Sequence, residues 1–272
     1  MQISQSSLSR ITRRSSLQIA GAIAASLILS PPILFAEDKK PDEKKGPPTI
    51  KFAFPLGIAR GSATKLTIRG LRLAEATEVR IEGAGEPISA TIKSKGKADV
   101  SDMLPAEKLG DTQVEIELTI PAGTSGEVSV IVVTPEGSTE PHALRVFDPA
   151  DLTTEKEPNG GFHNAQEIHS PATIGGTIGE NNDVDVFRIA GKKGEKIVAE
   201  VWASRLASPL DSLLTLYDEH SVVVAMNDDG DSGADSLLRA TLPADGIYFL
   251  SLVDANGRGG PLFAYLLSVV VG

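Results

Sequence analysis

Residues 208–218, Ser208-Pro-Leu-Asp-Ser-Leu-Leu-Thr-Leu-Tyr-Asp218, place apolar side chains at alternate positions after a Ser-Pro turn. In an extended chain, Leu214 and Leu216 point to one side and Thr215 to the other. Downstream, residues 227–230 (Asn-Asp-Asp-Gly) are turn formers, and residues 245–248 (Asp-Gly-Ile-Tyr) lead into a second alternating run. The stretch therefore predicts short, half-buried β-strands joined by tight turns.

The same period of two recurs along most of the chain. In the first half it appears in residues 50–54, 65–68, 78–81, 114–120 and 128–133, and in the second half in residues 187–189, 197–201, 214–216, 248–252 and 265–269. No long stretch has a helical period, although residues 103–109 could form one helical turn or a loop. We therefore predict an all-β protein with two tandem β-sandwich domains, residues 49–148 and 149–272.

The N-terminal residues have the features of an export signal. Arg10, Arg13 and Arg14 precede an acid-free, largely apolar run over residues 17–36. This pattern predicts a signal peptide cleaved after Ala36. Residues 12–17 also resemble a twin-arginine export motif, with Ser16 where that pattern prefers Phe, and the general and twin-arginine routes both stay open. An uncleaved anchor is disfavoured because prolines 31 and 32 would break a spanning helix, and the charged residues 37–48 predict a disordered linker.

The composition is acidic and contains no cysteine. There are 26 basic and 36 acidic side chains and a formal net charge of −10. Because residues 1–36 hold three arginines and no acid, their removal would leave 23 basic side chains against 36 acidic ones. Such a surface disfavours nucleic acid, which is bound mainly through Lys and Arg. The lack of cysteine excludes disulfides, thiolate metal sites and cysteine nucleophiles.

The sequence offers little support for catalysis. The chain has four histidines, at positions 142, 163, 169 and 220, and none accompanies a Gly-x-Ser-x-Gly or His-Glu-x-x-His motif. Paired carboxylates can serve a glycosidase, but aromatic residues make up only 4% of the chain, so sugar platforms are scarce. Trp202 points away from the apolar face of residues 197–201, and could either bind a partner or pack beneath a loop. We expect a non-enzymatic protein.

Acidic residues at the start of the second domain suggest a cation site. Glu155 and Glu157 are two residues apart, as are Asp183 and Asp185, so each pair can share one side of an extended chain. Pro158 keeps Glu157 out of the helical region. Amide oxygens are available nearby, from residues Asn159, Asn181 and Asn182. Ca²⁺ takes six to eight such oxygens, although the same residue types also cap turns.

The order and spacing of these motifs over residues 155–271 resemble the bacterial pre-peptidase C-terminal (PPC) domain. The resemblance implies a jelly-roll-like sandwich outside the cell, often attached to a secreted peptidase. It also implies calcium ligands, carried over by matched position to Glu155, Glu157, Asn159, Asn182 and Asp185, with Asp183 and the Thr177 hydroxyl as further candidates. One departure is Gly160, which stands where calcium-binding members tend to have another Asp or Asn. A second acidic run, residues 227–235, lacks the spacing of an EF-hand loop and is interpreted as a set of turns.

Residues 55–61, 66–70 and 79–83 resemble the IPT/TIG type of immunoglobulin-like domain. Taken together, these observations predict an exported binding or adhesion protein in the periplasm, at the cell surface or outside the cell. Calcium is the expected cofactor, with a ligand set that Gly160 leaves one side chain short. The expected partner is an extracellular or envelope protein or a polysaccharide. An accessory subunit of a secreted peptidase and a purely structural envelope component stay open as alternatives.

Overall fold

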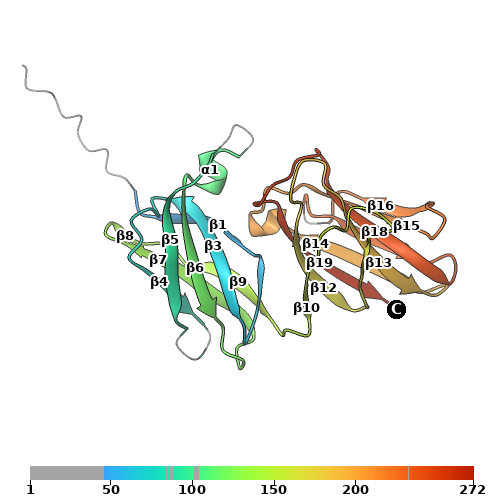
Figure 1. Ribbon diagram of the computed structural model, residues 1–272, viewed down its shortest axis with the longest axis horizontal. Helices are drawn as coiled ribbons and strands as arrows, with labels where there is room; N and C mark the ends of the chain where they lie inside the picture. The colour runs from blue at the N-terminus through green and yellow to red at the C-terminus, as the bar shows by residue number, and fades with distance from the viewer. Residues whose placement is uncertain (1–45, 84, 86–87, 101–103, 232) are drawn as a thin grey trace, which may run out of the picture. The chain divides into compact units, whose positions relative to one another are not determined.

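The computed structural model describes residues 46–83, 85, 88–100, 104–231 and 233–272. The predicted signal peptide (1–36) and most of the predicted linker (37–48) lie outside these residues. Regular structure in the described part is almost entirely β, as Figure 1 shows, and the two helical pieces are α1 (Ala106–Leu109) and the 3₁₀ turn η1 (Ser204–Leu206). No helix in this part of the chain is long and apolar enough to cross a membrane. The predicted all-β class is confirmed.

The strands of residues 49–147 form two facing sheets. The first has the order β1 (Thr49–Phe54), β3 (Ala63–Leu71), β6 (Thr112–Thr119), β5 (Ala90–Lys97). The second has the order β2 (Gly57–Ala59), β9 (His142–Phe147), β7 (Gly126–Thr134), β4 (Glu78–Glu82), with β8 (Gly137–Ser138) added to β7. In chain order these are the A-B-E-D and G-F-C sheets of an immunoglobulin fold. The parallel pairing of β2 with β9 closes the second sheet.

The core of this first sandwich follows directly from the alternation in the sequence. In β6, Val114, Ile116 and Leu118 are buried, while the residues between them face outward. They pack in one cluster with Val128 and Val130 of the opposite sheet. Burying an aliphatic side chain contributes about 1.5–3 kcal/mol, so this cluster holds the two sheets together without disulfides.

The strands of residues 152–271 form a second pair of sheets. One has the order β10 (Leu152–Thr154), β12 (Ala172–Thr177), β19 (Ala264–Val271), β14 (Lys196–Trp202), β17 (Leu237–Thr241). The other has the order β11 (Gln166–Glu167), β13 (Asp185–Gly191), β18 (Gly246–Asp254), β15 (Ser212–Tyr217), β16 (Val223–Asn227). The main core cluster lies between them and includes Phe187, Leu214, Leu250 and Leu267. The two sandwiches are therefore separate in their strand pairing.

Several strands escaped the sequence analysis because their patterns are weak. β5 and β16 lie at sheet edges, and β12 contains two consecutive glycines at its end. Edge strands carry exposed residues on both faces, so the period of two is blurred. The possible helical turn near residue 109 is present as α1, whose described residues include the buried Leu109.

A third apolar cluster contains residues from both sandwiches. Phe52 and Leu56 of the first meet Leu262 and Leu266 of the second, and Trp202 is partly buried against this cluster. The Arg145 guanidinium lies 3.4 Å from the centroid of the Trp202 ring. The ring is thus occupied by packing within the protein, which favours the packing role over the partner-binding role. Because residues 46–272 form one compact unit, the division into two independent domains stays a prediction.

Leu250 lies on β18, between two paired strands, and is 0% exposed. We expect Leu250→Ala to lower the free energy of unfolding by about 2–5 kcal/mol, because it leaves a cavity in a packed core. Val270→Ala, at a side chain that is 48% exposed, should change it by less than about 0.5 kcal/mol. Urea unfolding of both variants measures the difference. Equal effects would contradict the assignment of β18 to the core.

Candidate metal centre

Three carboxylates that are distant in sequence converge at one end of the second sandwich. Glu155 directly follows β10, and its backbone N–H donates to the Gly175 carbonyl of β12 at 3.0 Å. Asp185 begins β13 in the other sheet. One carboxylate oxygen from each of Glu155, Glu157 and Asp185 lies within 4.8 Å of the others. The two sheets therefore bring together one acid from β13 and two from residues 155–159, which we call the leading segment.

Asn159 lies at the centre of this arrangement and is 0% exposed. Its side-chain Nδ2 donates to Glu155 Oε1 at 3.0 Å, and its backbone N–H donates to Glu157 Oε2 at 2.9 Å. Its carbonyl oxygen accepts from the Val186 backbone N–H of β13 at 3.2 Å. Asn159 thus orients both glutamates and ties the leading segment to the strand that carries Asp185.

Two buried oxygens at this site have no hydrogen-bond donor. They are Asn159 Oδ1 and Asp185 Oδ1, and both residues are 0% exposed. A buried polar atom without a partner costs about 1–3 kcal/mol, and more when it is charged. Oxygen atoms without donors, next to two further carboxylates, form the kind of oxygen-rich cluster that binds a hard cation. The residues present therefore fit a calcium ion.

The electrostatics of the cluster lead to the same conclusion. Burial and the facing Glu155 carboxylate raise the pKa of Asp185 to about 10. Without a cation, two carboxylates so close together cannot both ionise cheaply, and one retains a proton. A bound divalent ion would supply the positive charge that this arrangement lacks.

Tyr265 and Gly176 belong to this site and were missed from the sequence. The Tyr265 hydroxyl donates to Asp185 Oδ2 at 2.7 Å, which links β19 of one sheet to β13 of the other. Tyr265 was interpreted only as part of an alternating core strand, although a buried tyrosine hydroxyl generally needs a partner. Gly176 is paired with Tyr265, and a Cβ there would lie 2.4 Å from the Tyr265 hydroxyl and 2.6 Å from Glu155 Oε2.

The remaining predicted ligands serve the surrounding loop. Asp183 Oδ2 accepts from the Gly179 N–H at 2.6 Å, and its Oδ1 accepts from the Val184 N–H at 2.8 Å, so this side chain braces a turn. Asn182 has a φ of 62° and donates its backbone N–H to the Gly257 carbonyl at 3.1 Å. Thr177 contributes its backbone N–H, which donates to Glu155 Oε2 at 2.8 Å.

Gly160 directly follows Asn159, the buried centre of the cluster. A Cβ at this position would lie 3.4 Å from the Val184 carbonyl oxygen, next to Asp185. Glycine leaves this position without a donor oxygen from a side chain.

The second acidic run forms turn contacts. Asp235 is buried and accepts from the backbone N–H groups of Ala203 and Ser204 at 3.1 and 2.6 Å, and from Arg205 Nε at 2.7 Å. Asn227 Nδ2 donates to the Asp229 carbonyl at 2.8 Å. These groups already have partners, which agrees with their interpretation as turn residues.

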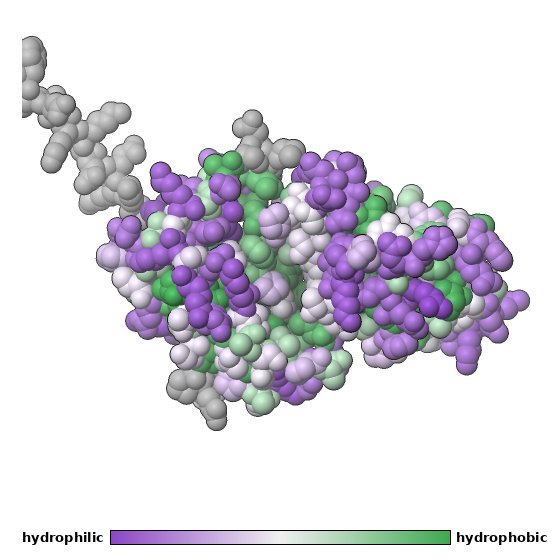
Figure 2. All heavy atoms as spheres, in the orientation of Figure 1, coloured by the Kyte–Doolittle hydropathy of each residue, from purple (hydrophilic) through white to green (hydrophobic). Residues whose placement is uncertain are grey.

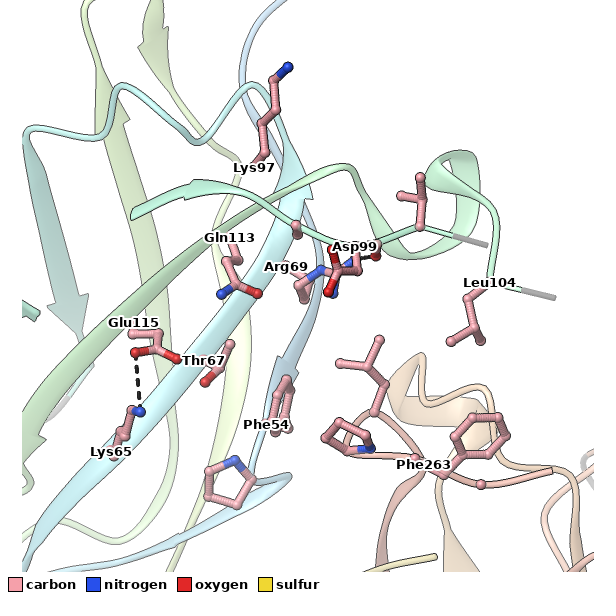
Figure 3. A pocket seen from close by; sticks show the side chains of 17 residues that line it. Phe54, Lys65, Thr67, Arg69, Lys97, Asp99, Leu104, Gln113, Glu115 and Phe263 are labelled. Atoms are coloured by element: carbon pink, nitrogen blue, oxygen red, sulfur yellow. Dashed lines mark hydrogen bonds and ion pairs between the residues drawn. The ribbon is translucent and has the colours of Figure 1, made fainter. Parts of the chain in front are cut away.

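A recess of about 730 Å³ lies apart from the carboxylates, between the outer face of β3 and β6 and the loop before β19. Figure 3 shows Phe54 on one wall and Phe263 on the other, with the Lys65–Glu115 ion pair along the side. That pair has an N–O distance of 3.1 Å, and Arg69 donates to the carbonyls of Asp99 and Gly110 at 2.7 and 3.0 Å. Two cationic side chains that line the recess, Lys65 and Arg69, therefore already have partners within the protein.

Comparisons with known proteins add one relative and several structural neighbours. No protein-family model matches the chain. Over 126 residues, 46% of the chain, it is 35% identical to a Deinococcus radiodurans protein named "Probable subtilase-type serine protease". This match covers 16% of that relative, so the chain spans only a small part of its length.

Two solved structures illustrate the neighbours of the fold. The pre-peptidase C-terminal domain of a Bacillus anthracis collagenase is 20% identical, with a TM-score of 0.32, and the match covers 42% of this chain and 99% of that chain. A periplasmic inhibitor of g-type lysozyme from Aeromonas hydrophila is 14% identical, with a TM-score of 0.31, and the match covers 45% of this chain and 96% of that chain. The PPC resemblance and the IPT/TIG resemblance both stay predictions.

Gly176 and Gly175 are adjacent on β12 and provide a matched pair of variants. Gly176→Ala should destabilise the protein by about 1–3 kcal/mol, because its Cβ would overlap Tyr265 and Glu155. Gly175→Ala should cost less, because the nearest atoms to its Cβ lie at 3.7 Å, an ordinary contact distance. Urea unfolding measures both, and a larger cost at Gly175 would contradict the packing described for Tyr265.

Asp185 should give the metal-free protein a specific pH dependence. Its pKa rises to about 10 on folding, from an ordinary value of about 3.9. The folded state therefore binds the proton of the Asp185 carboxyl more tightly than the unfolded state does. The stabilisation that this proton gives is complete below pH ~4 and is lost as the pH rises towards 10.

In a chelating buffer, Asp185→Asn should consequently gain stability relative to wild type between pH 5 and 9. The expected gain exceeds about 1.4 kcal/mol, the value of one pKa unit. Asp231→Asn, at a side chain that is 85% exposed, is the control and should follow wild type. Parallel stability curves for wild type and Asp185→Asn would show that Asp185 is not perturbed.

Proposed function

We propose that this protein is an exported, non-catalytic β-sandwich protein that binds a partner outside the cytoplasm and is stabilised by calcium. The observation that carries the calcium assignment is the pair of buried, donor-free oxygens of Asn159 and Asp185, beside the carboxylates of Glu155 and Glu157. The export assignment rests on the signal-like residues 1–36. The polar surface supports a role in water: hydrophilic side chains cover much of the face in Figure 2.

Four side chains would hold the ion: those of Glu155, Glu157, Asn159 and Asp185. Ca²⁺ accepts carboxylate and amide oxygens together and tolerates irregular geometry. Water would take the place of the further side-chain ligand that Gly160 lacks. Asp183 and Asn182, with their turn contacts, are assigned to the loop and not to the ion.

Calcium at this position would stiffen the connection between the two sandwiches. Glu155 follows β10 directly and lines a cavity of about 350 Å³ with Gly176 and Tyr265. Residues 54–59 of the first sandwich line the same cavity. Binding the ion would fix the leading segment against β12 and β13, and so limit motion of the residues that enter the second sandwich.

Burial of the Asp185 carboxylate argues against a hydrolase that uses this cluster. Asp185 and Tyr265 are 0% and 1% exposed, so a polymeric substrate could not reach the Asp185 carboxylate. The histidines come from separate elements: His142 is on β9, and His220 is in the turn between β15 and β16. These placements disfavour catalysis at this cluster.

A second candidate function is that of an accessory to a secreted peptidase. It is favoured by the 35% identity over 126 residues to a protein named as a subtilase-type serine protease. Affinity capture from the source organism's envelope and culture medium, followed by mass spectrometry, tests this role. A co-purifying peptidase would favour it, whereas a defined homo-oligomer alone would favour a structural envelope component. An envelope protein or polysaccharide as the captured partner would favour adhesion.

Calcium should raise the midpoint of thermal unfolding, whereas magnesium should not. At 100 times the dissociation constant, a ligand that binds only the folded state stabilises it by about 2.7 kcal/mol. Glu157→Gln should reduce this calcium-induced shift with little effect on the metal-free protein, because the Glu157 side chain is exposed. Asp183→Asn is the matched control, since its carboxylate is occupied by backbone N–H groups.

The calcium assignment fails if chelator and excess calcium give the same unfolding midpoint. An equal loss of the shift in Glu157→Gln and Asp183→Asn would show that the ion is held by general negative charge and not by the proposed ligands.

A further inference from the structure

The edge strand β16 differs from the other sheet edges of the protein. It is the last strand in its sheet and pairs only with β15. Residues 222–226 read Val-Val-Val-Ala-Met, without a charge or a proline. Val222, Val223 and Met226 are 58%, 54% and 66% exposed, and they make up three of the six exposed large apolar side chains in the described residues.

Other edges of the two sandwiches carry the usual protection against strand pairing. β5 has lysines at positions 93, 95 and 97, β4 contains Arg80 between two glutamates, and β17 contains Arg239. Charged residues at an edge prevent a further strand from adding to the sheet. The uncharged edges β2 and β10 have only three residues each. β16 is therefore the longest edge strand without charge.

The exposed side chains of β16 continue an apolar strip on the outer face of the sheet. Val223 pairs with Tyr217 and Met226 pairs with Thr215, while Leu214 and Leu216 point into the core. The Tyr217 ring lies 5.2 Å from that of Phe162. Phe162 stacks on Phe249 of β18 at 4.5 Å. A strand that paired with β16 would thus extend both the hydrogen-bonded sheet and this strip.

The two ends of β16 are defined by turn contacts. At one end, Asp218 Oδ1 accepts from the Val222 N–H at 2.8 Å, which closes the hairpin with β15. At the other, Asn227 Oδ1 accepts from the Leu237 N–H at 2.6 Å, which ties the strand to β17. A register shift lies near the hairpin, between Leu216 and Tyr217, and residues 225–227 continue in regular pairing. These contacts hold the strand extended before any partner arrives.

Charges at both ends of β16 indicate what can pair with it. Asp218 and Glu219 precede the strand, and Asp228 and Asp229 follow it. Asp231 lies further on and forms an ion pair with Arg239 at 3.6 Å. A second copy of β16 would place acids beside acids in either strand direction, and like charges repel. A segment with basic residues at its ends would instead meet complementary charge.

We propose that β16 is an acceptor edge for an extended segment of a partner protein, with apolar residues at alternate positions and Lys or Arg at both ends. Main-chain hydrogen bonds would supply affinity, and alternate side chains on the strip would supply specificity, as in strand addition to other sheets. This inference takes from the proposed function only that the protein binds a protein partner. It does not depend on calcium binding.

The test uses the full chain and a fluorescent synthetic peptide, Lys-Lys-Val-Thr-Val-Thr-Val-Lys-Lys. We expect saturable binding by fluorescence anisotropy, together with slower amide hydrogen exchange in residues 223–226. The same peptide with Glu in place of every Lys should bind about tenfold more weakly or not at all, because its ends would face acids. A version with proline at the central valine should also fail, because proline cannot donate to the ladder.

A matched pair of double variants separates the edge from general surface charge. Val223→Lys with Met226→Lys should weaken binding about tenfold or more, which corresponds to about 1.4 kcal/mol. Val198→Lys with Val270→Lys adds the same charge at exposed valines that pair with each other on strands with neighbours on both sides, and should leave the affinity within about twofold. Thermal unfolding checks that both variants are folded.

Three results would overturn the proposal: no binding of the Lys peptide, equal affinities of the two double variants, or self-association of wild type that Val223→Lys with Met226→Lys abolishes. The calcium-induced shift is measured on the same samples. A lost peptide interaction with an intact calcium response would remove the β16 assignment alone, and the reverse result would remove only the calcium site.

Discussion

The contact between Asp185, Tyr265 and Glu155 is the constraint on which the second sandwich depends. Asp185 belongs to β13 in one sheet, and Tyr265, which donates to it, belongs to β19 in the other. Glu155 lies at the end of the edge strand β10 and accepts from the Thr177 N–H of β12. A single polar cluster therefore joins both sheets to the leading segment, at the margin of an otherwise apolar core.

Such a cluster is costly in the absence of a counter-charge. A buried carboxylate with an unpaired oxygen disfavours folding, whereas hydrogen bonds from Tyr265 and Asn159 offset only part of this cost. The apolar clusters of the two sandwiches supply the remaining stability, with no disulfide to assist them. This balance is compatible with the proposed cation-dependent joint, because a bound cation would supply the missing counter-charge.

The two surfaces with proposed roles lie on different elements of the same sandwich. The carboxylate cluster involves β10, β12, β13 and β19, whereas the acceptor edge involves β15 and β16. β13 and β15 both pair with β18, so the central strand of one sheet lies between the two features. In the two proposals, calcium at one end of the sandwich would fix its connection to the preceding sandwich, and the free edge would be available to a partner.

The sequence by itself determined the all-β class, the positions of the core strands and most of the acidic cluster. Alternation in residues such as Val114, Ile116 and Leu118 is sufficient for this, because a period of two leaves only one way to bury a face. The tertiary structure alone decided that Asp185 joins Glu155 and Glu157 while Asp183 braces a turn, since both aspartates follow the same local pattern. It also decided the roles of Tyr265 and Gly176, because they meet through the register of β12 with β19. Pairing between strands some 90 residues apart depends on the whole fold, and no local pattern in the sequence encodes it.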